Sequence, residues 1–311
     1  MTLEFRGSYT VAVTPFTEDG GAIDTTALRS FLDWQLEVGV PGIIMLGTTG
    51  EFLTVSPDER AEIVQTTVRH VAGRIPVLVG TMNAHTNTAV FQSRQAEDLG
   101  ADGLMVLPPY YYTPTEDEIV RYYGAICEAV SLPIMLYNNP VTSNVDMSAA
   151  LVARLARISD NIRYIKESSQ DLARVRDVID ASDGLLKVFA GERAVDSYLL
   201  GAIGYVNPFG NYIPRGSSRV FDLLESGRID DARRLQRVID EIDEIIAEGH
   251  PTYGHQCYSK ALAATVGHPV GDVRPPLTTF EQLGAEGRDR VARIRVLISE
   301  LDKLVDDLVG R

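Results

Sequence analysis

Short apolar runs alternate with helical patterns along the whole chain of 311 residues, and this alternation constrains the fold more than any other feature. The runs are almost continuously hydrophobic, which is typical of parallel strands covered on both faces. Eight strands are expected, at residues 11–16, 42–47, 76–81, 103–108, 133–138, 162–167, 187–191 and 204–208. Eight strands with intervening helices predict an α/β protein of the (β/α)8, or TIM-barrel, type. An open doubly wound sheet is the alternative, but no Gly-x-Gly-x-x-Gly turn follows the first strand, so dinucleotide binding has no support.

The helices carry readable start signals. Ser56 with Glu59 and Thr115 with Glu118 have the spacing of capping boxes. After the last strand we expect a C-terminal helical extension with helices at about 217–248, 255–267 and 287–308. The first has an apolar stripe that packs on the barrel or forms a subunit contact, made of Val220, Leu223, Leu224, Leu235, Val238, Ile242 and Ile246. We therefore predict a barrel core at residues 1–225 and C-terminal helices at 226–311, packed on the barrel as one structural unit.

Composition limits the class of protein. Hydrophobic residues make up 45% and charged residues 23% of the chain, as in soluble globular proteins. No run is long enough to span a membrane, and the N-terminus lacks a secretory pattern, so a cytoplasmic location is expected. The net charge of −14 disfavours nucleic acid and anionic membrane as partners. The two cysteines, Cys127 and Cys257, are too few for a disulfide framework or a zinc site.

Lys166 stands at the end of an apolar strand and is one of only four lysines in the chain. A lysine in this position must be desolvated or paired, and desolvation lowers the pKa of an amine from about 10.4 and makes it a nucleophile. One interpretation is therefore a lysine that forms a Schiff base with a carbonyl substrate. The alternative is a strand-end lysine whose stem packs while its head reaches water or pairs with Glu167.

Other unusual residues also follow predicted strands, where barrels place their active sites. The second strand ends in Gly-Thr-Thr-Gly-Glu at 47–51. The N–H groups and the hydroxyls of Thr48 and Thr49 suit a carboxylate, although an ordinary turn with hydroxyl caps has the same residues. Tyr137 lies at the end of the fifth strand. It is either a core aromatic whose hydroxyl reaches water or a proton shuttle beside the amine.

Two further loops carry candidate site residues. Three consecutive tyrosines at 110–112 lie between prolines and cannot all be buried, so we expect a rim, a lid or a subunit contact. Asn207 near the end of the eighth strand and Asn211 after it are uncharged candidates for recognising hydroxyl or carbonyl groups. A carboxylate-binding turn, a tyrosine and a lysine at one barrel face together predict an enzyme that forms an iminium with a 2-oxo acid.

The Gly-Thr-Thr-Gly-Glu turn, the Tyr-Asn-x-Pro sequence at 137–140 and Lys166 make the chain resemble the dihydrodipicolinate synthase/N-acetylneuraminate lyase family over about residues 6–300. The resemblance implies that Lys166 is the nucleophile, Tyr137 the general acid and base, and Thr48 and Thr49 the carboxylate-binding residues, with Thr48 also in the proton relay. Tyr111 matches a relay tyrosine that is lent across a tight dimer interface. Gly191 and Val206 match backbone and wall positions around the iminium. A homo-oligomer, either a dimer or a tetramer, is implied as well.

Departures from the family pattern concern the substrate. Members that condense pyruvate with aspartate semialdehyde have an arginine five residues after the tyrosine, and this chain has Thr142 there. The bidentate grip that an arginine supplies to a carboxylate is therefore missing. In the family, the lysine and an acidic residue are usually followed by Ala-Thr-Gly. This chain has Ser168, Ser169 and Gln170 at those three positions instead. Both changes favour a pocket for a hydroxylated or differently charged partner.

We therefore predict a Schiff-base-forming lyase, an aldolase or a dehydratase, that acts on pyruvate or on a substrate of the 2-keto-3-deoxy sugar acid type. Deamination of such an acid passes through the same iminium. The alternatives are 4-hydroxy-tetrahydrodipicolinate synthase and, from another class, a non-catalytic 2-oxo-acid sensor. No cofactor beyond the covalent Schiff base on Lys166 is expected, and no metal, because the sequence has no His/Asp/Glu cluster with metal spacing. We assign His255 a structural role.

Overall fold

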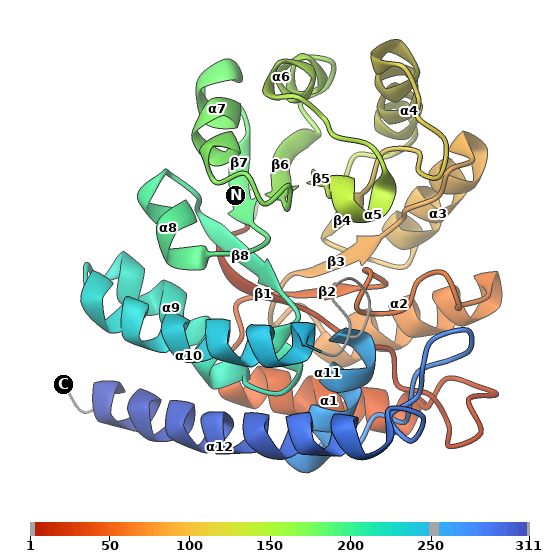
Figure 1. Cartoon of the computed structure of the whole chain (residues 1–311). Coiled ribbons are helices and arrows are strands. Elements are labelled where there is room, and N and C mark those ends of the chain that lie inside the picture. Colours follow the sequence, from red (N-terminus) through yellow and green to blue (C-terminus); the bar gives the residue numbers. More distant parts are fainter. Residues whose placement is uncertain (1–3, 249–254, 310–311) are drawn as a thin grey trace. The chain divides into compact units, whose positions relative to one another are not determined.

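The structure is a computed structural model that describes residues 4–248 and 255–309. The first three residues of the predicted barrel core and parts of the predicted C-terminal region lie outside these ranges. The strands lie in chain order in a closed parallel barrel, which confirms the predicted (β/α)8 fold (Figure 1). They are β1 (Gly7–Val11), β2 (Ile43–Met45), β3 (Val77–Gly80), β4 (Gly103–Val106), β5 (Ile134–Asn138), β6 (Ile162–Glu167), β7 (Lys187–Ala190) and β8 (Gly204–Asn207). The chain divides into two compact units: the first comprises Met1–Arg6 and Pro76–Val206, and the second Gly7–Ile75 and Asn207–Arg311.

The first unit alternates strands and helices from β3 onward (Figure 1). Its helices are α3 (Thr86–Asp98), α4 (Glu116–Ala129), α5 (Pro140–Ser143), α6 (Ala149–Ala156), α7 (Ala173–Ala181) and α8 (Ala194–Leu199). Its core strands are buried along nearly their whole length, because a parallel strand between helices has no solvent face. The capping box of Thr115 and Glu118 begins α4 as predicted.

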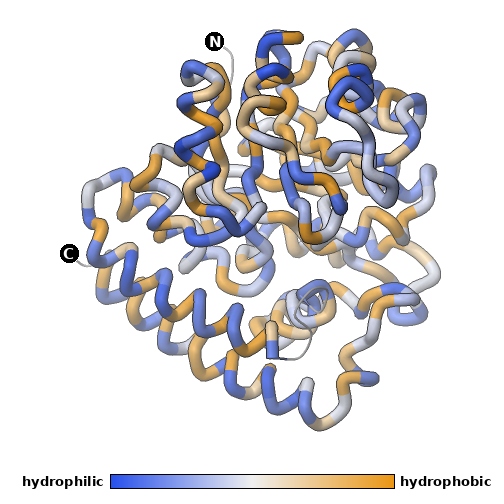
Figure 2. The backbone as a smooth tube through the Cα atoms, turned by 45° about the horizontal axis from the view of Figure 1, so that its top comes forward, coloured by the Kyte–Doolittle hydropathy of each residue, from blue (hydrophilic) through white to orange (hydrophobic). Residues whose placement is uncertain are grey.

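The second unit holds β1, β2 and the other helices of the described residues. These helices are α1 (Thr25–Val38), α2 (Pro57–Val71), α9 (Pro214–Glu225), α10 (Ile229–Ala247), α11 (His255–Thr265) and α12 (Gly284–Val309), with a short 3-10 turn, η1, at Phe209–Asn211. The predicted capping box of Ser56 and Glu59 begins α2. Hydrophobic and hydrophilic stretches alternate along α10 and α12 (Figure 2), which is the pattern of helices that bury one face.

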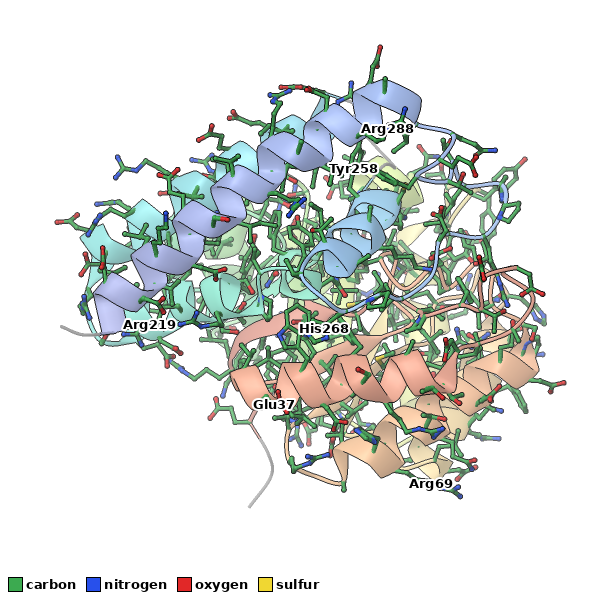
Figure 3. All side chains as sticks on the ribbon, turned by 90° about the horizontal axis from the view of Figure 1, so that it is seen from below. Glu37, Arg69, Arg219, Tyr258, His268 and Arg288 are labelled. Atoms are coloured by element: carbon green, nitrogen blue, oxygen red, sulfur yellow. The ribbon has the colours of Figure 1, made fainter. Side chains whose placement is uncertain are left out.

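The C-terminal helices pack on one another and on β1. α12 contacts α9, α10 and α11, and α9 contacts β1, so the predicted apolar stripe is buried inside the second unit. Figure 3 shows these helices from below, with Tyr258 on α11 and Arg288 on α12. The Arg290 guanidinium donates to the Tyr258 hydroxyl at 3.2 Å. His268, also labelled there, stacks on Trp34 of α1 with ring centroids 4.0 Å apart. The predicted domain boundary at residue 225 stays a prediction.

Two predicted elements are wrong in detail. The helix expected at 217–248 is two helices, because Gly227 has a left-handed φ of +75° and ends α9. Its N–H bonds the Leu224 carbonyl at 3.0 Å, and the Arg228 N–H bonds the Leu223 carbonyl at 2.8 Å, which is a Schellman motif.

The strand expected at 11–16 is instead Gly7–Val11. The chain leaves the ladder after residue 12, because the Val13 N–H donates to the Asn211 side chain and Pro15 has no N–H to donate. Ser8 and Thr10 are polar although they are buried, so a pattern of hydrophobic residues alone does not predict the strand at this position. The other predicted strands agree with the structure to within two residues at each end.

Candidate active site

Lys166 and Tyr137 face each other across two neighbouring strands. They are register partners in the parallel pair β5–β6, so their side chains leave the sheet on the same face. The Lys166 Nζ lies 4.2 Å from the centroid of the Tyr137 ring. Lys166 is 8% exposed and Tyr137 is 3% exposed. The strand register therefore brings the predicted nucleophile to the predicted proton shuttle.

The next residue of each strand points to the opposite face. Asn138 and Glu167 are also register partners, and the Asn138 amide donates to both Glu167 carboxylate oxygens at 3.2 Å. The Ser169 N–H donates to Glu167 at 2.8 Å, and burial raises the pKa of the Glu167 carboxyl. Glu167 therefore has its own partners on the other side of the sheet. The alternative in which it pairs with Lys166 is not the arrangement found.

The backbone just after β7 closely approaches the residues that follow Lys166. The Gly191 N–H donates to the Glu167 carbonyl at 2.8 Å. A Cβ on Gly191 would lie 1.7 Å from the Ser168 hydroxyl oxygen, so only glycine fits here. Close packing against Ser168 thus explains why position 191 is a glycine. Val206, on β8, is fully buried.

Thr48 and Thr49 belong to the second unit, in a tight turn after β2. Leu46 and Glu51 flank the turn with left-handed φ angles of 59° and 55°. A Cβ on Gly50 would lie 2.9 Å from the Ala12 carbonyl oxygen, so this position also requires glycine. Thr49 is buried, whereas Thr48 is half-buried. The turn is thus held in an uncommon conformation, as is frequent at ligand-binding loops.

A buried ion pair holds this turn. The Lys260 ammonium lies 2.7 Å from Glu51, and their side chains are 1% and 0% exposed. Lys260 also donates to the Asp272 carbonyl at 2.8 Å, and the Arg274 N–H donates to Glu51 at 3.0 Å. Burial lowers the pKa of the Lys260 amine, although Glu51 opposes that change. Sequence analysis missed Lys260, whose only signal was the rarity of lysine in the chain.

The beginning of α11 contacts the same turn. His255 Nε2 lies 3.3 Å from the Thr49 hydroxyl oxygen, and the Gln256 amide donates to the Thr48 carbonyl at 3.4 Å. His255 was assigned a structural role, and its contact with Thr49 is compatible with that role. The contact also places an imidazole at the predicted carboxylate-binding residue.

The remaining candidates differ in their surroundings. Tyr111 is 92% exposed and has a φ of +82°, which is uncommon for a residue with a side chain. This exposure agrees with the predicted rim, lid or subunit contact.

Asn207 is fully buried in the second unit. Its amide donates to the Ser8 hydroxyl at 2.9 Å, and its side-chain oxygen accepts the Gly210 N–H at 3.1 Å. The side-chain N–H and oxygen of Asn207 therefore make hydrogen bonds within the protein. The role of Asn207 in binding the substrate stays a prediction.

Two kinds of feature are absent from the described part of the chain. Residues 4–248 and 255–309 contain no group of three or more His, Cys, Asp or Glu side chains placed to hold a metal ion. No helix in the same ranges is long and apolar enough to cross a membrane.

A buried lysine over a tyrosine ring at the carboxyl ends of barrel strands is the arrangement expected of a lysine-dependent (β/α)8 enzyme of carbonyl chemistry. The chain belongs to the dihydrodipicolinate synthetase family, whose sequence profile matches residues 4–294. Members of this family are class I lyases that form a Schiff base on a lysine, and the chain is accordingly a lyase.

Individual relatives agree with this membership. The 4-hydroxy-tetrahydrodipicolinate synthase of Syntrophus aciditrophicus is 35% identical over 92% of this chain and 97% of that enzyme. The crystal structure of the chloride-inhibited dihydrodipicolinate synthase from Acinetobacter baumannii in complex with pyruvate is 32% identical, with a TM-score of 0.87 over 94% of this chain and 99% of that one. A prophage protein of the same family from E. coli K12, also in complex with pyruvate, is 29% identical with a TM-score of 0.88 over 96% and 99%.

Proposed function

We propose that this lyase forms an imine between Lys166 and a 2-keto acid and then cleaves, or eliminates a group from, a substrate of the 2-keto-3-deoxy sugar acid type. The observation that carries the proposal is the buried Lys166 amine 4.2 Å from the centre of the Tyr137 ring. Burial keeps water from competing for the amine, and the phenol supplies an acid within the same site. Relatives crystallised with pyruvate support a small 2-oxo acid as the substrate.

The chemistry begins with addition of the Lys166 amine to the keto carbon. The resulting carbinolamine receives a proton on its oxygen from Tyr137 and loses water, and the nitrogen is left as a protonated imine. The protonated imine then accepts the electrons of the C3–C4 bond as that bond breaks. The C4 hydroxyl gives its proton to the Tyr137 oxygen, C4 leaves as an aldehyde, and an enamine remains on Lys166. Loss of a hydroxide or amine from the substrate chain begins from the same imine. No metal or organic cofactor takes part in these steps.

The other site residues have roles that the family resemblance supports. Thr48 and Thr49 bind the carboxylate through the hydroxyls and N–H groups of their turn, and Thr48 also relays protons. Gly191 and Val206 line the imine, and Asn207 contributes to substrate binding. Tyr111 completes the relay in a neighbouring subunit of a homodimer or homotetramer. A cytoplasmic location stays a prediction.

Thr142 supports a partner other than aspartate semialdehyde. It occupies the position of the arginine that grips the semialdehyde carboxylate, and a half-buried hydroxyl cannot supply a charged bidentate contact. Its hydroxyl donates to the Asn139 carbonyl at 3.5 Å. Uncharged polar groups of this kind suit the hydroxyls of a sugar acid.

The second candidate function is 4-hydroxy-tetrahydrodipicolinate synthase, because relatives 33–36% identical to this chain carry that name. The two functions share the imine and differ in the second half of the reaction. A non-catalytic sensor is disfavoured, since binding alone does not require Tyr137 beside Lys166.

Trapping of the imine tests the shared step. The protein is incubated with pyruvate, reduced with borohydride, digested and analysed by mass spectrometry. We expect a pyruvyl increment on the Lys166 peptide and none on the Lys260 peptide, which serves as an internal control for a buried lysine. Lys166→Ala should abolish the adduct. An unmodified Lys166 peptide in the wild-type protein would contradict the proposed function.

A comparison of substrates then separates the two candidates. Pyruvate release from 2-keto-3-deoxy sugar acids is measured beside the consumption of pyruvate with aspartate semialdehyde. A higher kcat/KM for a sugar acid supports the lyase, whereas a higher value for the semialdehyde establishes the synthase instead.

A further inference from the structure

Asn139 lies between the catalytic strand and the helix that follows it. It directly precedes α5 at the N-cap position, where asparagine side chains usually accept a hydrogen bond from the first helical N–H groups. Its side chain makes no such bond. Pro140, the first residue of α5, has no N–H, so one of the unpaired donors usual at a helix start is absent here. The Asn139 amide is therefore free to act elsewhere.

The Asn139 amide instead contacts the predicted proton shuttle. Its Nδ2 donates to the Tyr137 hydroxyl oxygen at 2.8 Å. This distance is that of a well-formed hydrogen bond. The same phenol ring lies under the Lys166 ammonium, so one tyrosine contacts both the amide and the amine.

The backbone of Asn139 is fixed by its own contacts. Its carbonyl accepts the Ser143 N–H at 3.0 Å and the Ser143 hydroxyl at 2.8 Å. The following proline restricts Asn139 to extended backbone, and its φ of −144° agrees with that restriction. An anchored backbone gives the short side chain little freedom to move away from the phenol.

We propose that Asn139 is a positioning residue that orients the Tyr137 hydroxyl for proton transfer, an inference that rests on the proposed function. The amide N–H occupies one lone pair of the phenol oxygen, so the phenol proton points away from Asn139 and toward the substrate. When Tyr137 gives up that proton, the amide N–H stabilises the negative oxygen, since a donor favours the charged form of its acceptor. Asn139 thus assists both the direction and the driving force of the transfer.

Substitution with aspartate separates this role from a structural one. Aspartate, serine and asparagine are about equally good N-cap residues. A carboxylate has almost the same size as the amide but only accepts hydrogen bonds, so it would draw the phenol proton toward itself. Asn139→Asp therefore preserves a helix-capping role and reverses the hydrogen bond to Tyr137, while Asn139→Ser preserves the cap and removes that bond.

The experiment measures the rate of imine formation in a single turnover with pyruvate, by timed quenching with borohydride. For Asn139→Asp, we expect the limiting rate to fall on the order of 100-fold, the scale of a general acid's contribution. For Asn139→Ser, we expect a fall of roughly tenfold, the effect of one lost hydrogen bond. The apparent affinity for pyruvate and the melting temperature should stay close to those of the wild type. In a Tyr137→Phe background, Asn139→Asp should have almost no further effect.

Three results would overturn the inference. The first is an Asn139→Asp rate equal to that of the wild type. The second is a slowing of all Asn139 variants in proportion to a lowered melting temperature. The third is an Asn139→Asp effect that persists without the Tyr137 hydroxyl. Each would show that Asn139 does not act through the phenol. These results are distinct from failure of the proposed function, in which the wild-type protein itself forms no adduct.

Discussion

Two buried lysines of this chain have different surroundings. Lys260 is 1% exposed and paired with Glu51, whereas Lys166 is 8% exposed and lies over an uncharged ring. Lys260 is held by a carboxylate within the fold. The contact of Lys166 with the Tyr137 ring involves no counter-charge. The difference in partners supports a structural role for Lys260 and the proposed nucleophilic role for Lys166.

The first prediction concerns the Lys260–Glu51 pair. Lys260→Met leaves the Glu51 carboxylate buried without its partner, and we expect the free energy of unfolding to fall by about 3–5 kcal/mol. Denaturant unfolding measures this change. The double variant Lys260→Met/Glu51→Gln removes the stranded charge and should recover most of the loss. If the double variant is as unstable as the single one, the buried charge is not the cause.

At the scale of elements, the turn between α9 and α10 depends on one backbone angle. Gly227 has a left-handed φ, and a Cβ added there would meet nothing within 4 Å. Any cost of substitution therefore arises from the backbone conformation and not from a steric clash.

The second prediction follows from that geometry. Gly227→Ala should lower the free energy of unfolding by about 1–2 kcal/mol, the cost of a left-handed conformation for a residue with a Cβ. Gly124→Ala is the matched control, because Gly124 lies inside α4 and also has open space around its Cβ position. That change should stabilise the protein by roughly 0.5–1 kcal/mol. Denaturant unfolding measures the free energy of unfolding of both variants. Equal changes in the two would contradict a backbone origin of the Gly227 effect.

At the scale of the whole molecule, the exposed Tyr111 raises the question of which subunit uses it. A side chain that is 92% exposed on a left-handed backbone has little reason to be there in an isolated chain. A relay role in a neighbouring subunit would supply that reason.

The third prediction tests this role by complementation. Lys166→Ala and Tyr111→Phe are each expected to be nearly inactive as homodimers. In a symmetric dimer, a hybrid of the two variants has one site with an intact lysine and an intact partner tyrosine, so random mixing should restore about a quarter of wild-type activity. The activity of the two variants when they are co-expressed is compared with that of a mixture of the two variants purified separately. Absence of recovery would mean that Tyr111 serves its own subunit or has no catalytic role.

The predictable features are those that depend on a few neighbouring residues. The capping boxes at Ser56 and Thr115 were predicted because their partners lie three positions away. The break at Gly227 was missed, because the apolar stripe continues through it and one glycine is a weak helix terminator. The start of β1 was missed because Ser8 and Thr10 are polar and buried. Their burial depends on partners that are distant in the chain, such as Asn207 and Gln35.

The alternation of strands and helices, the family and the strand-end positions of Lys166 and Tyr137 were predictable from the amino-acid order, because period and motif are local properties. The folded chain was needed to show that these two residues are register partners and that Asn139 donates to the phenol. It was also needed to show that Lys260, and not Lys166, pairs with a carboxylate. The physical reason is that register, burial and ion pairing depend on which distant segments meet, and no local pattern specifies that.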